Sequence, residues 1–315
     1  MMNRTDAARF LADRDRFCIL THRRPDGDTV GSAAALCLGL RKLGKQAWIL
    51  ENPDFTPRFA YLYEGLTKAA PETEDVLVSM DVASPNMLPK VFEQYLGKIL
   101  LRIDHHGSAT GFTELELVDP KAAACAEIIY DVLLELGLTL DKEIATAIYV
   151  ATSTDTGCFR FANTTDHTFL TAAACAAAGA DIYGLNQVLF ETVTMGRLRI
   201  QGWIVENCRL LQEGQVAVCP IPAAVEAELG ATEDDMDNIC SFLRTLAGVK
   251  LAATLRETED GQVIKVSVRG VPGWDAAAVC AKFGGGGHKG AAGCSIRMPL
   301  AEAAEAVIAA MPMAE

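Results

Sequence analysis

The sequence predicts an α/β protein with two domains: an N-terminal doubly wound, mainly parallel sheet and a smaller C-terminal α/β domain. A length of 315 residues, half of them apolar, suits about two domains of ordinary size. In the first half, short apolar runs alternate with helical patterns, which is typical of βαβ units and a parallel sheet. Further on, two apolar runs flank Glu259-Asp260-Gly261, a turn signal that indicates a β-hairpin.

The N-terminal elements follow from apolar runs and helical periodicity. The apolar runs predict strands at 17–21, 46–50, 76–80 and 98–103. The periodic stretches predict helices at 31–43, from about Pro85 onward, at 122–136, at 142–153 and at 166–178. We expect Gly44 to end the first of these helices and Asp166 to cap the last one.

The stretch from 185 to 211 has a helical pattern without a Gly/Pro cluster, so we expect it to connect the domains as a helix. The expected organisation is a first domain over 1–190, a helical connector over 191–214 and a second domain over 215–315. In the second domain, strands are expected at 216–221, 249–258, 262–270 and near 294–297. Helices are expected at 237–248, near 274–282 and at the C-terminus.

Composition argues against several classes of protein. A net charge of −13 does not suit a protein that wraps long duplex DNA, although residues 262–298 hold five Lys or Arg against one acid and could bind a small anion. No run reaches the ~18 apolar residues of a membrane span, and the N-terminus lacks the apolar run of a signal peptide. The ten cysteines show no C-x-x-C spacing, which argues against a zinc knuckle and suits free thiols in the cytoplasm.

Metal-binding side chains follow three of the predicted strands at the point where each strand ends. His22 and Asp26-Gly27-Asp28 follow the first strand, Asp81 follows the third, and Asp104-His105-His106 follows the fourth. Because the carboxyl ends of strands in an open α/β sheet converge on one crevice, we expect these side chains to meet. Asp155, after the helix at 142–153, is a fourth contributor. Each motif alone would suit a turn or a helix cap, but their joint occurrence does not.

Five carboxylates gathered at one point would repel each other unless cations lay between them. Carboxylates mixed with two or three imidazoles suit Mn²⁺, with Mg²⁺, Fe²⁺ or Co²⁺ as alternatives. Two such ions, ~3.5–4 Å apart and sharing one carboxylate, would supply a hydroxide and stabilise both oxygens of an in-line displacement at phosphorus. The constellation therefore predicts the hydrolysis of a phosphate ester by two divalent ions.

Four motifs resemble those of the DHH phosphoesterases. They are H-R-R-P-D-G-D-x-x-G-S at 22–32, the lone Asp81, D-H-H at 104–106 and T-D-T-G-C-F-R-F at 154–161. G-G-G-H-K-G-A-A-G at 285–293 resembles the signature of the DHH-associated C-terminal domain. The chain looks most like the branch of bifunctional oligoribonucleases and phosphatases of 3′-phosphoadenosine 5′-phosphate (pAp). This resemblance implies that short RNA or DNA oligonucleotides or nucleotide phosphates are hydrolysed in a cleft between the domains.

The resemblance also implies a role for each matched residue. One metal ion would be held by His22, Asp26 and Asp81. The other would be held by Asp28, Asp81, His105 and Asp155, with Asp81 as the bridge. His106 would contact the scissile phosphate, and Asp104 would orient an imidazole. In the second domain the substrate would contact Arg269, Gly285, Gly286, Gly287 and His288, the glycines because they let backbone N–H groups approach a phosphate.

Several other functions remain open at this point. A RecJ-like single-strand DNA exonuclease would interleave aromatic with basic residues, and only 7% of this chain is aromatic. A phosphodiesterase of linear or cyclic dinucleotides would use the same chemistry. A manganese pyrophosphatase shares the N-terminal motifs but is not expected to carry G-G-G-H. A nucleotide-binding module with a dead site conflicts with the intact ligands. A homodimer is also left open.

Overall fold

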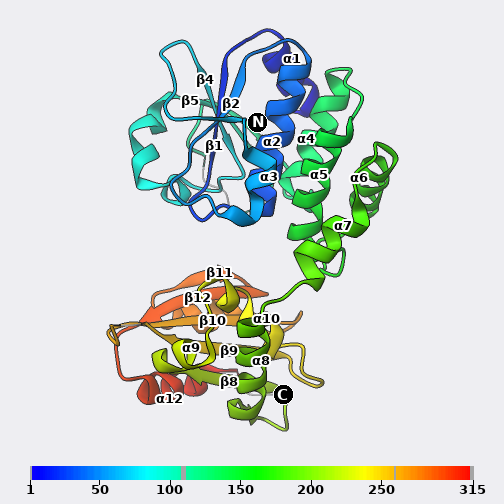
Figure 1. The fold of residues 1–315 in the computed structure, drawn as a ribbon. Coiled ribbons are helices and arrows are strands. Elements are labelled where there is room, and N and C mark those ends of the chain that lie inside the picture. The colour runs from blue at the N-terminus through cyan, green and yellow to red at the C-terminus, as the bar shows by residue number, and fades with distance from the viewer. Residues whose placement is uncertain (1, 108–110, 259, 313–315) are drawn as a thin grey trace. The chain divides into compact units, whose positions relative to one another are not determined.

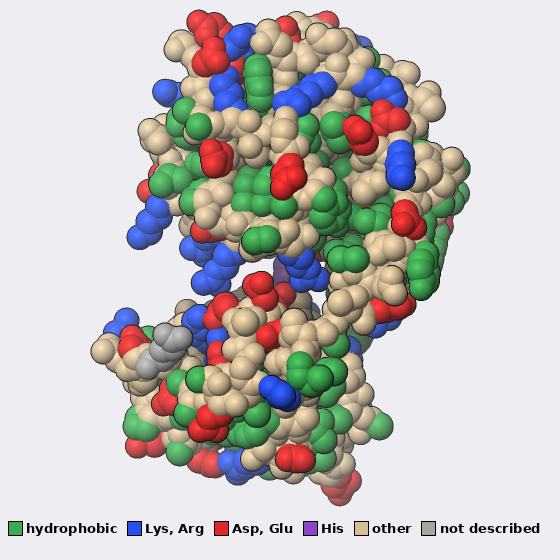
Figure 2. All heavy atoms as spheres, in the orientation of Figure 1, with side chains coloured by type: hydrophobic (Ala, Val, Ile, Leu, Met, Phe, Trp, Pro, Cys, Tyr) green, Lys and Arg blue, Asp and Glu red, His purple; other side chains and the backbone are tan. Residues whose placement is uncertain are grey.

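The computed structural model describes residues 2–107, 111–258 and 260–312. The chain folds into two compact units, residues 1–192 and 193–315, and a six-stranded sheet lies at the centre of each (Figure 1). Within the described ranges, no helix is both long and apolar enough to cross a bilayer. On the face drawn in Figure 2, acidic and basic side chains are interspersed on both units, with hydrophobic side chains between them.

The sheet of the first unit is parallel at every described pairing, which confirms the predicted α/β class. Its order is β3-β2-β1-β4-β5-β6. The chain therefore steps outward from β1 on one side and from β4 on the other, and the junction of β1 and β4 is the switch point at which α/β sheets bind ligands. The strands are β1 (Phe17–Thr21), β2 (Ala47–Leu50), β3 (Thr67–Lys68), β4 (Val76–Met80), β5 (Ile99–Asp104) and β6 (Leu115–Val118).

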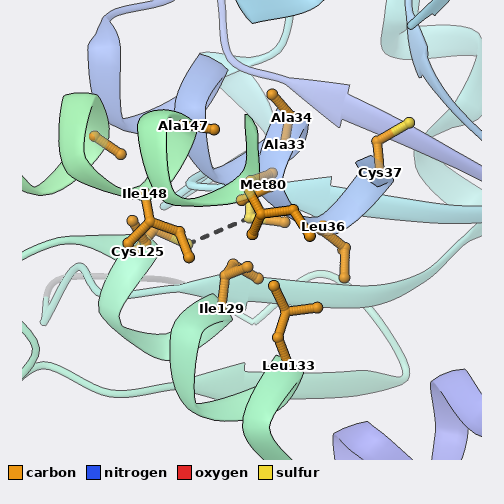
Figure 3. Close-up of a cluster of buried hydrophobic side chains, with 14 of the residues drawn as sticks. Ala33, Ala34, Leu36, Cys37, Met80, Cys125, Ile129, Leu133, Ala147 and Ile148 are labelled. Atoms are coloured by element: carbon orange, nitrogen blue, oxygen red, sulfur yellow. Dashed lines mark hydrogen bonds between the residues drawn. The ribbon is translucent and has the colours of Figure 1, made fainter. Parts of the chain in front are cut away.

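Both faces of this sheet are buried, and long helices cover one of them. Alternate residues of β1 divide between two cores, with Phe17 and Ile19 on the helical side. Figure 3 shows Leu36, Ile129 and Ile148 of three helices gathered near Met80 of β4. The long helices on this side of the sheet are α1 (Arg4–Ala12), α2 (Gly27–Lys42), α4 (Cys125–Glu135) and α5 (Lys142–Asp155).

The opposite face is covered by short 3₁₀ segments, so the α-helix expected from Pro85 is a wrong prediction. The segments are Pro85–Met87 and Lys90–Lys98, and Phe92 packs from them onto Cys18 and Leu20 of β1. Pro89 explains the outcome. Pro89 has no N–H to continue an α-helical ladder, and Leu88 before it has extended backbone, as residues before proline prefer.

The remaining helices of the first unit include one whose start was predicted wrongly. Thr165, not Asp166, caps α6, because the Thr165 side chain accepts from the Thr168 backbone N–H in a capping box. Helix α5 extends two residues past its predicted end at 153 and closes on Asp155. The remaining segments are the 3₁₀ turn Pro57–Phe59, α3 (Ala60–Tyr63), α6 (Asp166–Ala177), α7 (Ile182–Asn186) and a π-helical turn at Gln187–Glu191.

The second unit has a mixed sheet in the order β11-β12-β10-β9-β8-β7. Only β8 and β9 pair in parallel among its described strands. Strands β9 and β10 form the predicted antiparallel pair, while Glu259 of the predicted turn lies outside the described residues. The strands are β7 (Arg209–Leu211), β8 (Val216–Ile221), β9 (Leu251–Glu257), β10 (Ile264–Gly270), β11 (Gly286–His288) and β12 (Ala291–Ile296).

Helices cover both faces of the second sheet. The range 191–214, which we expected to be a helical connector, holds helix α8 but also strand β7, and α8 contributes Ile200 and Ile204 to the core of the second unit. The helix expected at 237–248 is shorter at both ends, and the left-handed conformation of Asn238 (φ 53°) accounts for its later start. The helices are α8 (Met195–Asn207), α9 (Ala223–Leu229), the 3₁₀ turn Asp234–Met236, α10 (Ile239–Leu243), α11 (Ala276–Ala281) and α12 (Leu300–Ala310).

Candidate functional site

The structure brings the predicted ligands of the first unit together at the carboxyl ends of β1, β4 and β5. Three groups of side chains each place their ligand atoms within 4.8 Å of one another. The groups share Asp81 or His105, so they form one continuous cluster. They are His22, Asp26 and Asp81; Asp28, His105 and Asp155; and Asp81, His105 and His106.

The first imidazole faces two carboxylates. His22 Nε2 lies 3.7 Å from Asp26 Oδ1 and 3.5 Å from Asp81 Oδ2. The other ring nitrogen, Nδ1, lies 2.8 Å from the Arg23 carbonyl oxygen and donates to it. Asn52 then fixes this segment, because its Nδ2 donates to the His22 carbonyl oxygen at 2.9 Å. Nε2 is thus held toward the carboxylates.

A second imidazole faces three carboxylates. His105 Nε2 lies 3.6 Å from Asp28 Oδ2, 3.6 Å from Asp81 Oδ1 and 3.7 Å from Asp155 Oδ2. Its Nδ1 lies 3.2 Å from the Ala122 carbonyl oxygen, which accepts the ring proton. Metal-binding histidines use this arrangement, in which a backbone carbonyl fixes the ring and leaves Nε2 for the ion.

These separations fit ligands of a shared cation better than they fit hydrogen bonds. At 3.5–3.7 Å the N···O distances exceed the ~2.7–3.2 Å of a hydrogen bond. Two atoms each ~2.1 Å from one octahedral ion stand roughly 3 Å or more apart. Asp81 Oδ1 is buried and accepts no hydrogen bond from any described residue, although a buried carboxylate oxygen normally has a partner. The donor set therefore fits divalent cations of the carboxylate- and imidazole-binding class.

Asp28 is held by the start of a helix that lies far along the chain. Its Oδ2 accepts from Cys125 N at 2.7 Å, and its Oδ1 accepts from Ala126 N at 3.1 Å. The α4 N-cap residue, Ala124, has no side chain able to accept these bonds. Asp28 thus caps α4, and the partial positive charge of that helix end favours a buried carboxylate there. Ser32 Oγ donates a further bond to Asp28 at 2.9 Å.

Asp81 has an unusual backbone conformation that places its carboxylate at the centre of the cluster. Its φ is 58°, in the left-handed region that aspartate tolerates better than most residues. Its backbone N–H donates to the Ile103 carbonyl oxygen at 2.8 Å, so the strained residue is tied to β5. One carboxylate oxygen then faces His22 and the other faces His105. This geometry suits a bridging ligand.

His106 is oriented by Asp104. His106 Nδ1 donates to Asp104 Oδ1 at 2.8 Å, and the same oxygen accepts the His105 backbone N–H at 2.8 Å. Burial lowers the pKa of His106, but its bond to Asp104 outweighs that effect, so the pKa lies above its ordinary value. The raised pKa therefore favours the protonated form of this imidazole beside the cluster.

The charges of the cluster are poorly balanced without cations. Burial, followed by the carboxylates of Asp81 and Asp155, raises the pKa of Asp28 well above its usual range. Burial likewise raises the pKa of Asp155 to about 7. Burial lowers the pKa of His105, but the surrounding carboxylates more than reverse this and raise it to about 9. The cluster thus retains protons that bound cations would displace.

Two glycines allow α2 and α5 to approach closely enough for Asp28 and Asp155 to share His105. A Cβ on Gly31 would lie 2.5 Å from the Ala147 carbonyl oxygen, and a Cβ on Gly27 would lie 2.3 Å from Thr154 Oγ1. Neither distance is sterically allowed.

Two supporting asparagines were missed by sequence reasoning. Asn163 Nδ2 donates to the carbonyl oxygens of Ala123 and Asp155, at 2.9 and 3.2 Å. Asn52 could have been found, because it follows strand β2 as the ligands follow their own strands. No pattern in the sequence marked Asn163.

In the second unit, Arg269 and His288 lie on one side of the sheet. Ala291 of β12 pairs with Arg269 on β10 and with His288 on β11, and residues opposite each other in neighbouring strands project to the same face. Val268 and Ala292 alternate with them and pack into the core under α11 and α12. The surface formed by Arg269, Ala291 and His288 is called the hairpin platform below.

The three glycines beside this platform differ in whether a larger side chain would fit at their positions. A Cβ on Gly285 would lie 2.3 Å from the Gly293 carbonyl oxygen, and one on Gly287 would lie 2.6 Å from the Ala291 carbonyl oxygen. Both glycines are therefore needed to form the hairpin itself. Gly286 is exposed, and a Cβ there would meet nothing within 4 Å. The predicted contact with substrate is sterically open at Gly286, and it stays a prediction at all three glycines.

Each of the two units matches the model of a known protein domain. Residues 16–152 match the DHH family, N-terminal domain, and residues 213–312 match the DHHA1 domain. The chain is 33% identical to the bifunctional oligoribonuclease and PAP phosphatase NrnA of Thermus thermophilus, over 93% of this chain and 88% of that protein. It is 28% identical to the protein of the same name from Bacillus subtilis, over 93% of each.

Solved structures show the same fold over nearly the whole chain. An exopolyphosphatase-related protein from Bacteroides fragilis aligns with a TM-score of 0.87 at 21% identity, covering 98% of this chain and 95% of that one. Exonuclease RecJ bound to manganese aligns with a TM-score of 0.56 at 14% identity, over 98% of this chain and 94% of that one.

Proposed function

Because the chain belongs to the DHH family and carries a DHHA1 domain, we propose that it is a metal-dependent phosphoesterase that hydrolyses short oligonucleotides and pAp. The observation that carries this proposal is the convergence of His22, Asp81 and His105 with further carboxylates at one place. At that place a buried carboxylate oxygen, Asp81 Oδ1, accepts no hydrogen bond from any described residue. The substrate class follows from the names of the relatives that match over nearly their whole length. RecJ-like exonuclease activity and dinucleotide hydrolysis are the alternatives that a product analysis would reveal.

We propose two cation sites that share Asp81. One is formed by His22, Asp26 and Asp81, and the other by Asp28, Asp81, His105 and Asp155. When bound there, divalent cations would supply the positive charge and the acidified water that attack on a phosphoester needs. Mn²⁺ is the proposed occupant, because mixed carboxylate and imidazole donors suit it.

The protein's own groups position and protonate the substrate in this proposal. Asp104 accepts the Nδ1 proton of His106, and we propose that the Nε2 side of that ring contacts the scissile phosphate. Because the bond to Asp104 outweighs burial and raises the pKa of His106, the ring holds a second proton more readily than an ordinary histidine and would give it to the departing oxygen. The pairing of a fixed donor with an orienting carboxylate is a common device of general acid catalysis.

The hairpin platform is proposed to bind a second, non-scissile phosphate. Arg269 and His288 can both donate to phosphate oxygens, and the small side chain of Ala291 between them leaves room for the ligand. Replacing either Arg269 or His288 by Ala is expected to raise KM for pAp about tenfold, because a charge-assisted hydrogen bond is lost. Metal content should not change.

Steady-state kinetics and metal analysis of the two variants test whether Arg269 and His288 bind phosphate without affecting the bound cations. Arg297→Ala is a matched control, because Arg297 is an exposed arginine just beyond β12 and off the platform. A loss of bound cation in the Arg269 or His288 variant would contradict a role in phosphate binding alone.

Substrate length gives a further prediction. A protein with a net charge of −13 offers no extended basic track for a long strand, so phosphates beyond the bound few nucleotides are expected to contribute little or to be repelled. We expect kcat/KM to fall about tenfold as oligonucleotides lengthen beyond about five units. Kinetics on a graded length series at fixed Mn²⁺ and salt would measure this. Processive digestion of a long strand at the rate of the dimer would favour the RecJ-like alternative.

We also propose that the enzyme works in a reducing compartment such as the cytoplasm. All ten cysteines are free thiols in the structure, and most of them are buried. A reducing compartment keeps thiols in that state.

A further inference from the structure

The turn that follows Asp155 has a rare backbone. Gly157, Cys158 and Phe159 have φ values of 56°, 58° and 62°, so three consecutive residues are left-handed. L-residues normally adopt this conformation one at a time, and such strain concentrates at functional sites. The turn begins directly after a residue of the proposed metal centre.

Hydrogen bonds hold this turn in its strained form. The Thr156 carbonyl oxygen accepts the backbone N–H groups of both Arg160 and Phe161, at 2.9 and 3.0 Å. Thr156 Oγ1 accepts from Phe159 N at 3.1 Å, and Arg160 Nε donates to the Gly157 carbonyl oxygen at 2.6 Å. The turn is therefore one rigid unit, and Asp155 adjoins it at the end of α5.

The two phenylalanines of the turn point to different surroundings. Phe159 is an anchor, because its ring packs at 6.0 Å from Tyr149 and at 5.6 Å from Phe169, measured between ring centroids. The Phe161 ring lies against Gly157, where a Cβ would be only 2.3 Å from a ring carbon. Yet 52% of Phe161 is exposed to solvent. The structure thus packs part of this aromatic ring against its own turn and leaves the rest open to solvent.

We infer that Phe161 stacks on the base of the nucleotide whose phosphate is bound at the metal centre beside Asp155. This inference rests on the proposed function and names a specificity residue for it. An exposed ring that already packs against its own turn loses less entropy than an unrestricted side chain when a planar partner covers it. Stacking on an aromatic side chain is independent of base identity, which suits an enzyme that degrades oligonucleotides of mixed sequence.

Steady-state kinetics of Phe161→Ala on two substrates test the inference. The substrates are pAp and the same ribose bisphosphate without its base. The variant is expected to raise KM for pAp about tenfold or more and to leave the base-free substrate unchanged. Phe161→Trp should restore KM for pAp, because indole also stacks on bases. Tyr183→Ala, which removes a more exposed aromatic ring on α7, is the control and should change neither substrate.

Three other outcomes would each overturn the inference. An unchanged KM for pAp in Phe161→Ala overturns the stacking role. An equal loss on both substrates overturns it too, because the ring would then only support the turn at Asp155. If the wild-type protein hydrolyses neither substrate but cleaves other phosphoesters, the proposed substrate class is wrong, and the base-stacking role is refuted along with it.

Discussion

Replacing Asp81 with Asn is expected to lower kcat by about a thousandfold or more while leaving the fold intact. The carboxylate faces both His22 and His105, so its loss affects both proposed cation sites at once, whereas other ligands serve one site. Asn is nearly isosteric and is also tolerated in the left-handed conformation that residue 81 adopts. The backbone should therefore keep its place. Activity at saturating Mn²⁺, bound-metal content and the melting temperature measure the three parts of this prediction.

A matched substitution separates the loss of a ligand from the loss of a surface charge. Asp13→Asn removes an exposed carboxylate that follows α1 and lies outside the cluster, and it should leave kcat and metal content unchanged. If Asp81→Asn retained substantial turnover at saturating Mn²⁺, the bridging role of Asp81 and the shared-site arrangement would both have to be abandoned.

Removing divalent cations is expected to abolish turnover and to lower the melting temperature, and the second effect should grow with pH. In the cation-free protein, the pKa of Asp155 is raised from 3.8 to about 7 and that of His105 from 6.5 to about 9. A raised folded-state pKa gives stability at low pH that is lost as pH rises through the folded value. The cation-free protein should therefore lose stability steadily between about pH 4 and pH 9.

Bound cations replace the retained protons, so their affinity rises with pH. At a cation concentration about a thousand times Kd, one site adds ~4 kcal/mol of stability, which corresponds to roughly 8 °C or more in the melting temperature of a unit of this size. Melting curves with and without Mn²⁺ at acidic, neutral and mildly alkaline pH measure the gain. A gain that stays constant or shrinks as pH rises would contradict the placement of cations among these carboxylates.

The ligand cluster could be foreseen because parallel strands place their carboxyl ends on one edge. His22, Asp81 and Asp104 come directly after or at the end of three apolar strands, so local sequence and one topological rule predicted their meeting. Strands β3 and β6 were not foreseen, because they have only 2 and 4 residues and carry polar side chains.

Other features depend on contacts between distant parts of the chain. Asp28 caps α4 from a position 97 residues earlier than Cys125, and no local pattern indicates such a bond. The prediction of an α-helix near Pro85 is wrong, although Pro89 is a local sequence signal against a continuous α-helix there. The alignment of Arg269 with His288 depends on the pairing register of three strands, which sequence periodicity leaves undetermined.

Product analysis of the Mn²⁺-loaded wild-type protein tests the central claim most directly. The protein would be incubated separately with pAp, RNA of two to about five units, a longer single strand and cyclic di-AMP, with Asp81→Asn as the inactive control. We predict AMP and inorganic phosphate from pAp, mononucleotides from the short RNA, and far slower conversion of the other two substrates. Cleavage of none of them by the wild-type protein at any Mn²⁺ concentration would contradict the assignment as a phosphoesterase of short oligonucleotides and pAp.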